Sequence, residues 1–242
     1  MASELATDLI SDTETEFDIV IDYYRSQETR FVLESFLDQV KLFFEKNPRL
    51  HKGSFPVVHS VKARLKDPEH LRDKLLRKKL EGVVVTESNL FENITDLAGV
   101  RVLHLYQEQF GPIHKEILWK ISTGDWILAE TPIAYTWDPE SIEYYHGLGI
   151  NTKLKDSQYT SVHYLVSPNN GSNICCEIQV RTLFEEIWGE IDHAINYPHH
   201  TASIACKEQL RVLSKLISTG TRLSDSIFRS YQEYQVNKSD KA

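Results

Sequence analysis

The sequence predicts a mixed β-sheet covered by helices, an α/β or α+β fold. Helix-like segments open and close the chain, and strand-like segments alternate with helices between them. The 242 residues are 41% hydrophobic, which is enough for one substantial domain with a core of its own, or for a catalytic domain with helical flanks. No internal repeat or low-complexity linker divides the chain.

Composition restricts the function classes. The net charge is -8, so nothing global indicates a nucleic-acid binder, and any anion site must be local. Two of the 3 cysteines are the adjacent Cys175 and Cys176, so we expect reduced thiols rather than a disulfide framework. The acidic N-terminus predicts no signal peptide, and no apolar run approaches the roughly 18 residues of a membrane span. We therefore expect a cytoplasmic protein with no membrane partner.

Residues 17–47 have helical spacing, with a stripe formed by Leu33, Leu37, Val40 and Phe44 that Pro48 ends. Residues 57–66 alternate, and Lys62, Arg64 and Lys66 share one strand face. Three cations on one face repel each other unless an anion or carboxylates lie opposite.

Asp67 and Pro68 are typical of a helix start. The helix up to about Gly82 should bury Leu71, Leu75 and Leu76 and present cations, among them Lys74, on its other surfaces.

The middle of the chain predicts a short helix within residues 83–93, a buried strand up to residue 105, a helix over 113–121, a strand over 126–137 and an irregular segment over 138–158. Asp96 stands at the entrance of the buried strand and Arg101 within it, and both need a partner there. Tyr159 precedes a further strand that contains His163, and the turn at 169–172 predicts a hairpin to the next strand.

That next strand alternates between a core face and a face carrying Glu177, Gln179 and Arg181. Thr182 should cap a helix that Pro198 stops. Its apolar residues at helical spacing are Leu183, Phe184, Ile187, Trp188, Ile191 and Ile195. After Pro198 the tail is helical, with core-like positions at Leu210, Leu213, Ile217, Leu223 and Ile227.

Several kinds of site are missing from the sequence. There is no phosphate-binding GxxxxGK[ST] loop, no GxGxxG after a strand, no HExxH and no CxxC pair. What remains are two strand-borne acids, Asp96 and Glu177, and a set of cations. Two carboxylates and substrate phosphates can hold Mg²⁺, and cations stabilise charge during phosphoryl transfer. The residues alone therefore indicate a metal-dependent enzyme acting on a nucleotide.

Four motifs sharpen this interpretation. In chain order, the sequence resembles the signatures of the RelA/SpoT-type alarmone synthetase domain at the basic ARLKDPEHLRDKLLRK, ITDLAGVRV, KDSQYTSVHYLV and EIQVRTLFEEIWGEIDHAINY. The resemblance runs over residues 57–198 and implies a nucleotidyltransferase-like mixed sheet. It also implies a small stand-alone GTP pyrophosphokinase, which moves the β,γ-pyrophosphate of ATP to the ribose 3′-hydroxyl of GDP or GTP and makes (p)ppGpp with Mg²⁺ as cofactor.

The resemblance also implies roles for single residues. Arg64 and Arg101 would stack on adenine, and Lys66 and Lys74 would neutralise the ATP phosphates. Asp96 would bind Mg²⁺, and Glu177 would join the metal site or act as general base. The remaining roles are acceptor binding by Tyr159, Lys155 and His163 and support of Glu177 by Gln179 and Arg181.

Two departures from the family concern the acceptor. Gln158 stands where the family commonly has Gly, and Pro198-His199-His200 follows Tyr197 where the family often has Lys. A toxin-like relative that makes (p)ppApp or pyrophosphorylates the tRNA 3′ end is the nearest alternative, although the net charge of -8 disfavours tRNA. A silent nucleotide-binding module is the second alternative, disfavoured because Asp96, Glu177, Arg64 and Tyr159 are all present.

The expected organisation has three parts. Residues 1–50 form an N-terminal helical extension, 51–200 the RelA/SpoT-like pyrophosphotransferase domain and 201–242 a C-terminal helical extension. The last part packs on its own domain or on a second subunit of a homo-oligomer, and the sequence leaves that choice open.

Overall fold

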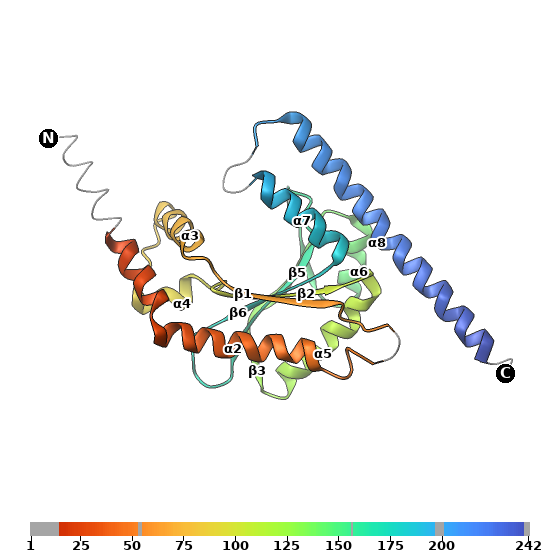
Figure 1. Ribbon diagram of the computed structural model, residues 1–242, viewed down its shortest axis with the longest axis horizontal. Coiled ribbons are helices and arrows are strands. Elements are labelled where there is room, and N and C mark those ends of the chain that lie inside the picture. Colours follow the sequence, from red (N-terminus) through yellow and green to blue (C-terminus); the bar gives the residue numbers. More distant parts are fainter. Residues whose placement is uncertain (1–14, 53–54, 156, 197–200, 240–242) are drawn as a thin grey trace.

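A six-stranded mixed sheet forms the centre of the protein, which we describe from a computed structural model (Figure 1). The structure describes residues 15–52, 55–155, 157–196 and 201–239. The strand order is β1-β2-β6-β5-β3-β4, with β2 parallel to β6, β3 parallel to β4 and the other neighbours antiparallel. The strands are β1 Ser60–Leu65, β2 Ala98–His104, β3 Trp126–Tyr135, β4 Asn151–Lys153, β5 Ser161–Pro168 and β6 Cys176–Thr182.

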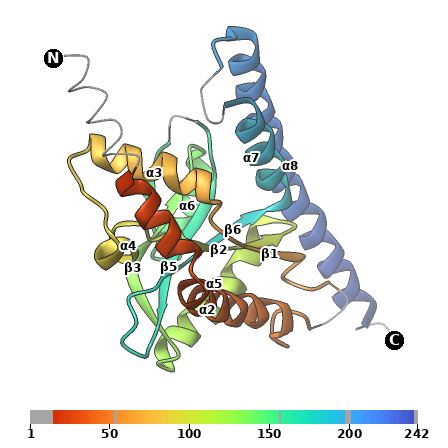
Figure 2. The same ribbon diagram turned by 60° about the vertical axis from the view of Figure 1, so that its left-hand side comes forward.

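Helices cover both faces of this sheet. In Figures 1 and 2, α2 and α5 lie on one face, α3 and α7 lie on the other, and α8 runs along α7 and past the edge of the sheet. The bounds are α2 Gln27–Lys46, α3 Pro68–Leu80, α4 Leu90–Asn93, α5 Phe110–Ser122, α6 Pro139–Gly147, α7 Leu183–Asn196 and α8 Ile204–Ser239, with 3₁₀ turns at Glu87–Asn89 and Gln107–Gln109. Residues 15–25 are also helical.

The core lies between the sheet and α2. The central strands β2 and β6 contribute Val100, Val102, Ile178 and Val180, all of them fully buried. Pairing of β5 with β6 confirms the predicted hairpin. The predicted mixed sheet flanked by helices is therefore correct. None of the helices in the described ranges has the length and apolarity needed to cross a membrane.

Two element predictions were wrong. Residues 138–158, expected to be irregular, contain α6 and β4. An Asp138-Pro139 start opens α6, the same signal that opens α3 at Asp67 and Pro68, where the Asp67 carboxylate accepts the Glu69 amide at 2.8 Å. The expected helix over 17–47 is broken at Ser26, which caps α2 by accepting the Thr29 amide.

Several apolar residues expected in the core are exposed instead. Leu76 is 48% exposed because it lines a cleft between α3 and α7. On α7, Ile187 is 53% exposed and Ile191 38%. On α8, Leu223 and Ile227 are exposed. The buried face of α8 is mostly polar and carries Leu210, Ser214, Ile217, Thr221 and Asp225.

Candidate functional site

The polar face of the sheet places its charged residues in rows across the strands. Strand register sets Lys62 beside Arg101, Arg101 beside Gln179 and Gln179 beside His163, so one row spans β1, β2, β6 and β5. Side chains at paired positions lie on the same face of a sheet. Four residues that are far apart in the sequence thus form one continuous surface.

The neighbouring row forms the floor of a cavity. Arg64 pairs with Gly99, and Gly99 pairs with Glu177. Since Gly99 has no side chain, space remains between Arg64 and Glu177, and a cavity of about 330 Å³ opens there. Its lining includes Arg64, Lys66, Asp96, Arg101, Glu177 and Gln179.

Asp96 lies at one end of this cavity and is held by two lysines. Its carboxylate accepts Lys66 Nζ at 2.8 Å and Lys74 Nζ at 2.7 Å. Burial raises the pKa of Asp96, but the two ammonium groups outweigh burial and lower the pKa overall. Asp96 is therefore an ionised carboxylate shared by the two cations expected to meet ATP phosphates.

Glu177 lies in a chain of hydrogen bonds along the sheet. Glu177 Oε1 is 3.0 Å from His163 Nδ1, and His163 Nε2 is 3.0 Å from the Tyr159 hydroxyl. The Gln179 amide donates to Glu177 Oε2 at 2.6 Å. Burial raises the pKa of Glu177, but His163 and Gln179 outweigh burial and lower it. The carboxylate is thus ionised and fixed in direction.

These two carboxylates fit a Mg²⁺ ion that also binds substrate phosphates. Both are ionised and line the same cavity, as a hard divalent cation requires. Each oxygen of Asp96 already accepts a hydrogen bond from a lysine ammonium, so positive charge lies beside this carboxylate in the place that a metal ion could take. No group of three or more His, Cys, Asp or Glu ligands occurs among the described residues, so an all-protein metal cage does not form there.

Arg101 is tied to α7. Its guanidinium lies 3.2 Å from Glu186 Oε1 and 2.5 Å from Glu190 Oε1. Glu186 is 4% exposed and also pairs with Lys62 at 2.8 Å and Arg181 at 2.5 Å. One helix carboxylate therefore joins cations from β1, β2 and β6.

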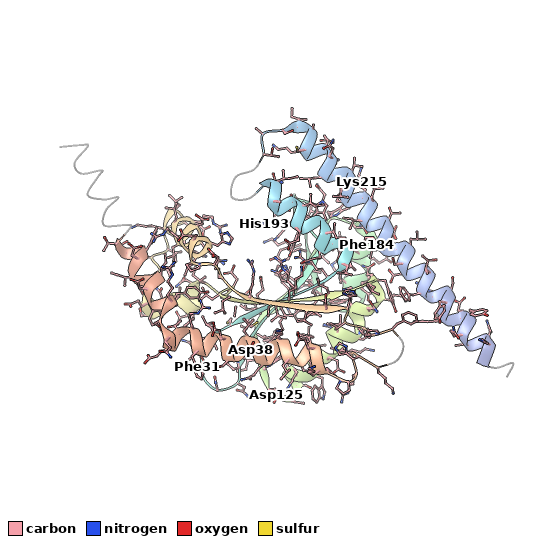
Figure 3. All side chains as sticks on the ribbon, in the orientation of Figure 1. Phe31, Asp38, Asp125, Phe184, His193 and Lys215 are labelled. Atoms are coloured by element: carbon pink, nitrogen blue, oxygen red, sulfur yellow. The ribbon has the colours of Figure 1, made fainter. Side chains whose placement is uncertain are left out.

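A larger cavity of about 790 Å³ extends from this surface between α3 and α7. The rings of His70 on α3 and His193 on α7 lie 6.3 Å apart, and Figure 3 shows His193 on α7. The cavity shares Arg64, Arg101 and Gln179 with the smaller one and adds Tyr159 and Arg181. The two cavities thus adjoin each other and share part of their lining.

Tyr159 is held between cations. The Arg181 guanidinium lies 5.6 Å from its ring centroid and Lys155 Nζ lies 4.7 Å from it. Lys155 also lies 4.2 Å from the Tyr135 ring, and burial lowers the pKa of its ammonium. An aromatic ring beside cations can hold a base together with its phosphates.

Comparison with known proteins decides the family. The sequence model described as "Region found in RelA / SpoT proteins" matches residues 63–202, more than half of the chain. The chain belongs to the RelA/SpoT family.

Relatives support this assignment. GTP pyrophosphokinase YwaC of Bacillus subtilis (strain 168) is 25% identical over 178 residues, which cover 69% of this chain and 71% of YwaC. The small alarmone synthetase 1 of Bacillus subtilis bound to its product pppGpp has a similar fold, with a TM-score of 0.62, 17% identity and coverage of 85% of this chain and 97% of that one. A GTP pyrophosphokinase family protein from Streptococcus pneumoniae gives 0.62 at 21% identity, with 87% and 97% covered.

The backbone at Gln158 explains why the RelA/SpoT pattern commonly has glycine at this position. Gln158 has φ of 53°, the left-handed conformation that glycine adopts without strain. The backbone before Tyr159 therefore has a shape that suits glycine, and the departure adds a side chain to it. The second departure, Pro198-His199-His200, lies outside the described residues.

The sequence-predicted residues of this RelA/SpoT chain gather in one region, directly or through a neighbour. Lys74 reaches the smaller cavity through Asp96 and His163 reaches it through Glu177, whereas Lys155 contacts Tyr159, which lines the larger cavity. Sequence analysis missed Glu186. A signal existed, because Glu186 falls three residues after Leu183 on the stripe assigned to the core, where an acid needs a cationic partner.

Proposed function

We propose that this RelA/SpoT protein is a cytoplasmic, Mg²⁺-dependent GTP pyrophosphokinase that uses ATP as donor and GDP or GTP as acceptor to make (p)ppGpp. One observation carries the proposal. Two ionised carboxylates, each fixed by different partners, line one cavity together with Arg64, Lys66 and Arg101. That cavity adjoins a larger one containing an aromatic ring and further cations.

The proposed reaction moves one diphosphate. The acceptor 3′-oxygen attacks the β-phosphorus of ATP, the bond from that phosphorus to the α-bridging oxygen breaks, and AMP leaves. Glu177 takes the proton of the 3′-hydroxyl, and His163 keeps its carboxylate pointed toward the cavity. Tyr159 stacks on the acceptor base, and Lys155 meets acceptor phosphates.

The donor side uses the basic set. Lys66 and Lys74 turn from Asp96 to the phosphates of ATP, and the planar guanidinium of Arg64 is suited to stack on adenine. Arg101 takes the same role once it leaves Glu190. Mg²⁺, held by Asp96 and Glu177, would offset the negative charge that develops on the transferred phosphates.

The decisive experiment supplies γ-labelled ATP with GDP, GTP, ATP or tRNA in turn and identifies the labelled product. Label in (p)ppGpp supports the proposal. Label in (p)ppApp or at the tRNA 3′ end would show that an adenine nucleotide or tRNA is the acceptor instead of GDP or GTP. No transfer to any of the four acceptors would refute the enzymatic function.

A matched variant tests the base. Glu177→Gln should still bind a non-hydrolysable ATP analogue through Asp96 and the cations but lose transfer by about 10²-fold or more, as expected for removal of a general base. Removal of Mg²⁺ with EDTA should abolish transfer, and added Mg²⁺ should restore it. Transfer by Glu177→Gln at the parental rate would remove Glu177 from the mechanism.

A further inference from the structure

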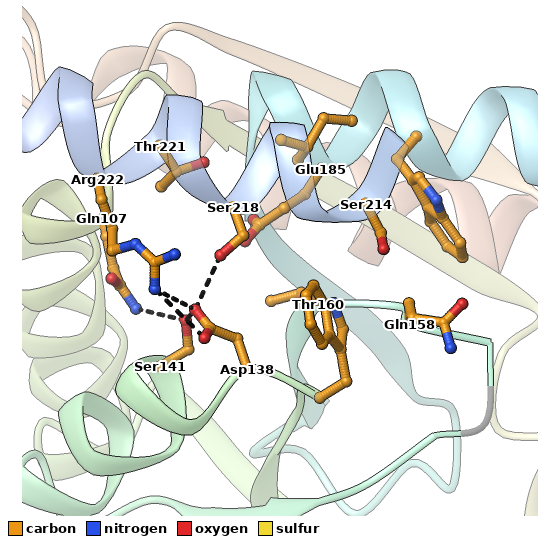
Figure 4. Close-up of a pocket in the computed structure, with 13 residues that line it drawn as sticks. Gln107, Asp138, Ser141, Gln158, Thr160, Glu185, Ser214, Ser218, Thr221 and Arg222 are labelled. Carbon is orange, nitrogen blue, oxygen red and sulfur yellow. Dashed lines mark hydrogen bonds and ion pairs between the residues drawn. The ribbon is translucent and has the colours of Figure 1, made fainter. Parts of the chain in front are cut away.

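A third cavity lies between α8 and the loop that leads to Tyr159. It has a volume of about 290 Å³ and is lined by Trp137, Leu154, Lys155, Gln158, Arg211, Ser214 and Lys215. Figure 4 shows Gln158 of the loop below Ser214 of α8, and Figure 3 shows Lys215 on the same helix. The cavity is therefore closed on one side by the loop that leads to Tyr159 and on the other by α8.

The charge of this cavity is one-sided. Three of its lining residues are cations, and none of the described lining residues is an acid. Arg211 and Lys215 are one helical turn apart, a spacing at which like charges destabilise a helix. In a chain of net charge -8, such a cluster is a local exception.

Four other cations of the site already have carboxylate partners. Lys62, Lys66, Lys74 and Arg101 each form an ion pair with an acid. Within the part of the chain that the structure describes, neither Arg211 nor Lys215 forms an ion pair, and Lys155 lies over two aromatic rings and forms no ion pair within 4 Å. This cavity thus offers positive charge that a bound anion can use without displacing a carboxylate.

Lys155 joins the cavity to the proposed acceptor site. It lines the cavity while its ammonium lies 4.7 Å from the centroid of Tyr159. Gln158, which directly precedes Tyr159 and has a left-handed backbone, lines the cavity as well. An acceptor whose base stacks on Tyr159 can therefore extend past Lys155 toward Arg211 and Lys215.

We propose that the cavity formed by Lys155, Arg211, Lys215 and Trp137 binds phosphate groups of the acceptor substrate. The inference rests on the proposed function, because it extends the acceptor site assigned there. The phosphates come from one of two sources, the 5′-phosphate chain of a nucleotide or the phosphodiester backbone of a polynucleotide. In both cases α8 contributes directly to acceptor affinity.

The test removes the two α8 cations and leaves Lys155 in place. Arg211→Ala with Lys215→Ala should raise KM for the acceptor about 10-fold or more, with KM for ATP unchanged. The matched control is Lys115→Ala with Lys238→Ala, which removes two positive charges from exposed positions of α5 and α8 outside all the cavities described above. The control should keep the parental KM for both substrates.

Acceptors with different phosphates identify the source. If the 5′-chain enters the cavity, the parent should favour GTP over GDP and GDP over GMP, and the double variant should lose that order. If a polynucleotide enters, tRNA should compete with the acceptor for the parent and not for the double variant. Equal acceptor KM in parent and double variant, together with unchanged competition by tRNA, would overturn the proposal while leaving the pyrophosphokinase function intact.

A binding measurement separates this inference from the proposed function. Calorimetric titration with inorganic tripolyphosphate, in the presence of saturating non-hydrolysable ATP analogue, should show a site in the parent and in the control that the double variant lacks. Such a site would support the cavity even if no acceptor became labelled. Equal tripolyphosphate binding by all three proteins would refute it.

Discussion

At the scale of the residue, His163 has a clear influence on Glu177. Burial acts to raise the pKa of Glu177, and the hydrogen bond from His163 is the largest influence that lowers it. His163 also bonds the Tyr159 hydroxyl, so it connects the proposed base to the ring proposed to hold the acceptor. A change at His163 should therefore act on the protonation of a neighbour.

We predict that His163→Phe shifts the pH dependence of transfer. Loss of the hydrogen bond leaves burial dominant, so the pKa of Glu177 rises and the acid limb of the kcat/KM profile moves to higher pH. His163→Gln, whose amide can still donate to Glu177, should shift the limb less. An acid limb at the same pH in parent and His163→Phe would show that Glu177 does not set it.

At the scale of the element, the packing of α7 against Arg181 requires a glycine at position 189. A Cβ at Gly189 would lie 2.8 Å from Nη1 of Arg181, a residue that is 3% exposed. Arg181 in turn lies over the Tyr159 ring and pairs with Glu186. A helix that presented any larger residue here would displace the guanidinium.

Gly189→Ala is accordingly expected to lower stability despite the better helix propensity of alanine. Overpacking costs about 1–3 kcal/mol, and the propensity gain offsets about 1 kcal/mol of it. Urea unfolding measures the change, and KM for the acceptor should rise with it. Gly147→Ala is the control, because its Cβ would meet nothing within 4 Å; a loss of the same size there would contradict the packing argument.

A second prediction for α7 concerns its start. Glu185 Oε2 accepts the Thr182 amide at 2.6 Å, and the Thr182 hydroxyl accepts the Glu185 amide, a capping box. Burial raises the pKa of Glu185 to about 7 from an ordinary value of 4.5. Between these two values the folded protein keeps a proton that the unfolded chain has released, so this group makes the protein less stable as pH rises through the window.

Glu185→Gln should remove this dependence, because the amide oxygen still caps the helix but does not titrate. The variant should therefore gain stability relative to the parent between pH 5 and pH 8, as measured by urea unfolding at both values. Glu143→Gln, at an exposed position of α6, should show no such gain. A constant difference between Glu185→Gln and the parent at the two pH values would contradict the raised pKa.

Much of the fold could be predicted from the sequence, because alternation and capping act locally. Thr182 and Asp67 cap the helices expected of them, and the strands bearing Glu177 and His163 lie close to their expected positions, with Asp96 in the turn just before β2. The partners of these residues could not be predicted. The bonds from Lys66 and Lys74 to Asp96 join elements about 20 to 30 positions apart, and only tertiary packing selects them.

The missed role of Glu186 has the same origin. Its spacing placed it on a stripe that looked apolar, while Ile187 and Ile191 on that helix face outward. Which side of an amphipathic helix faces the core depends on what the helix packs against. Here the side of α7 that carries Glu186 faces the sheet, where Glu186 pairs with three cations, and the two isoleucines are left exposed.

At the scale of the whole molecule, α8 is bound to the rest of the chain by both polar and aromatic contacts. Trp188 Nε1 donates to the Leu210 carbonyl at 3.0 Å, and Tyr106 and Phe228 stack at 4.3 Å. Asp138, shown in Figure 4, accepts hydrogen bonds from Ser218 and Arg222 of α8. The tail helix thus packs on the domain that precedes it.

We expect Asp138→Ala to loosen α8. The change removes the acceptor of Ser218 and leaves Arg222, which is 36% exposed, with Glu140 alone, so we expect a cost of about 1–2 kcal/mol. Hydrogen exchange should accelerate along α8 and less in the central strands. Asp138→Asn keeps an acceptor and should cost less; equal exchange in the Asp138→Ala variant and the parent would show that α8 is held by its apolar contacts.

The pairing of Asp96 with Lys66 and Lys74 has a consequence for how the donor would bind. Before binding, the site already holds two cations and one anion in contact. A magnesium nucleotide would bring both charges with it, so in the proposed mechanism its phosphates would pair with the lysines and Asp96 would hold its metal. Binding is then an exchange of ions between partners, with few counterions released to solvent. The affinity for magnesium–ATP should accordingly depend only weakly on ionic strength, unlike that of a site lined by cations alone.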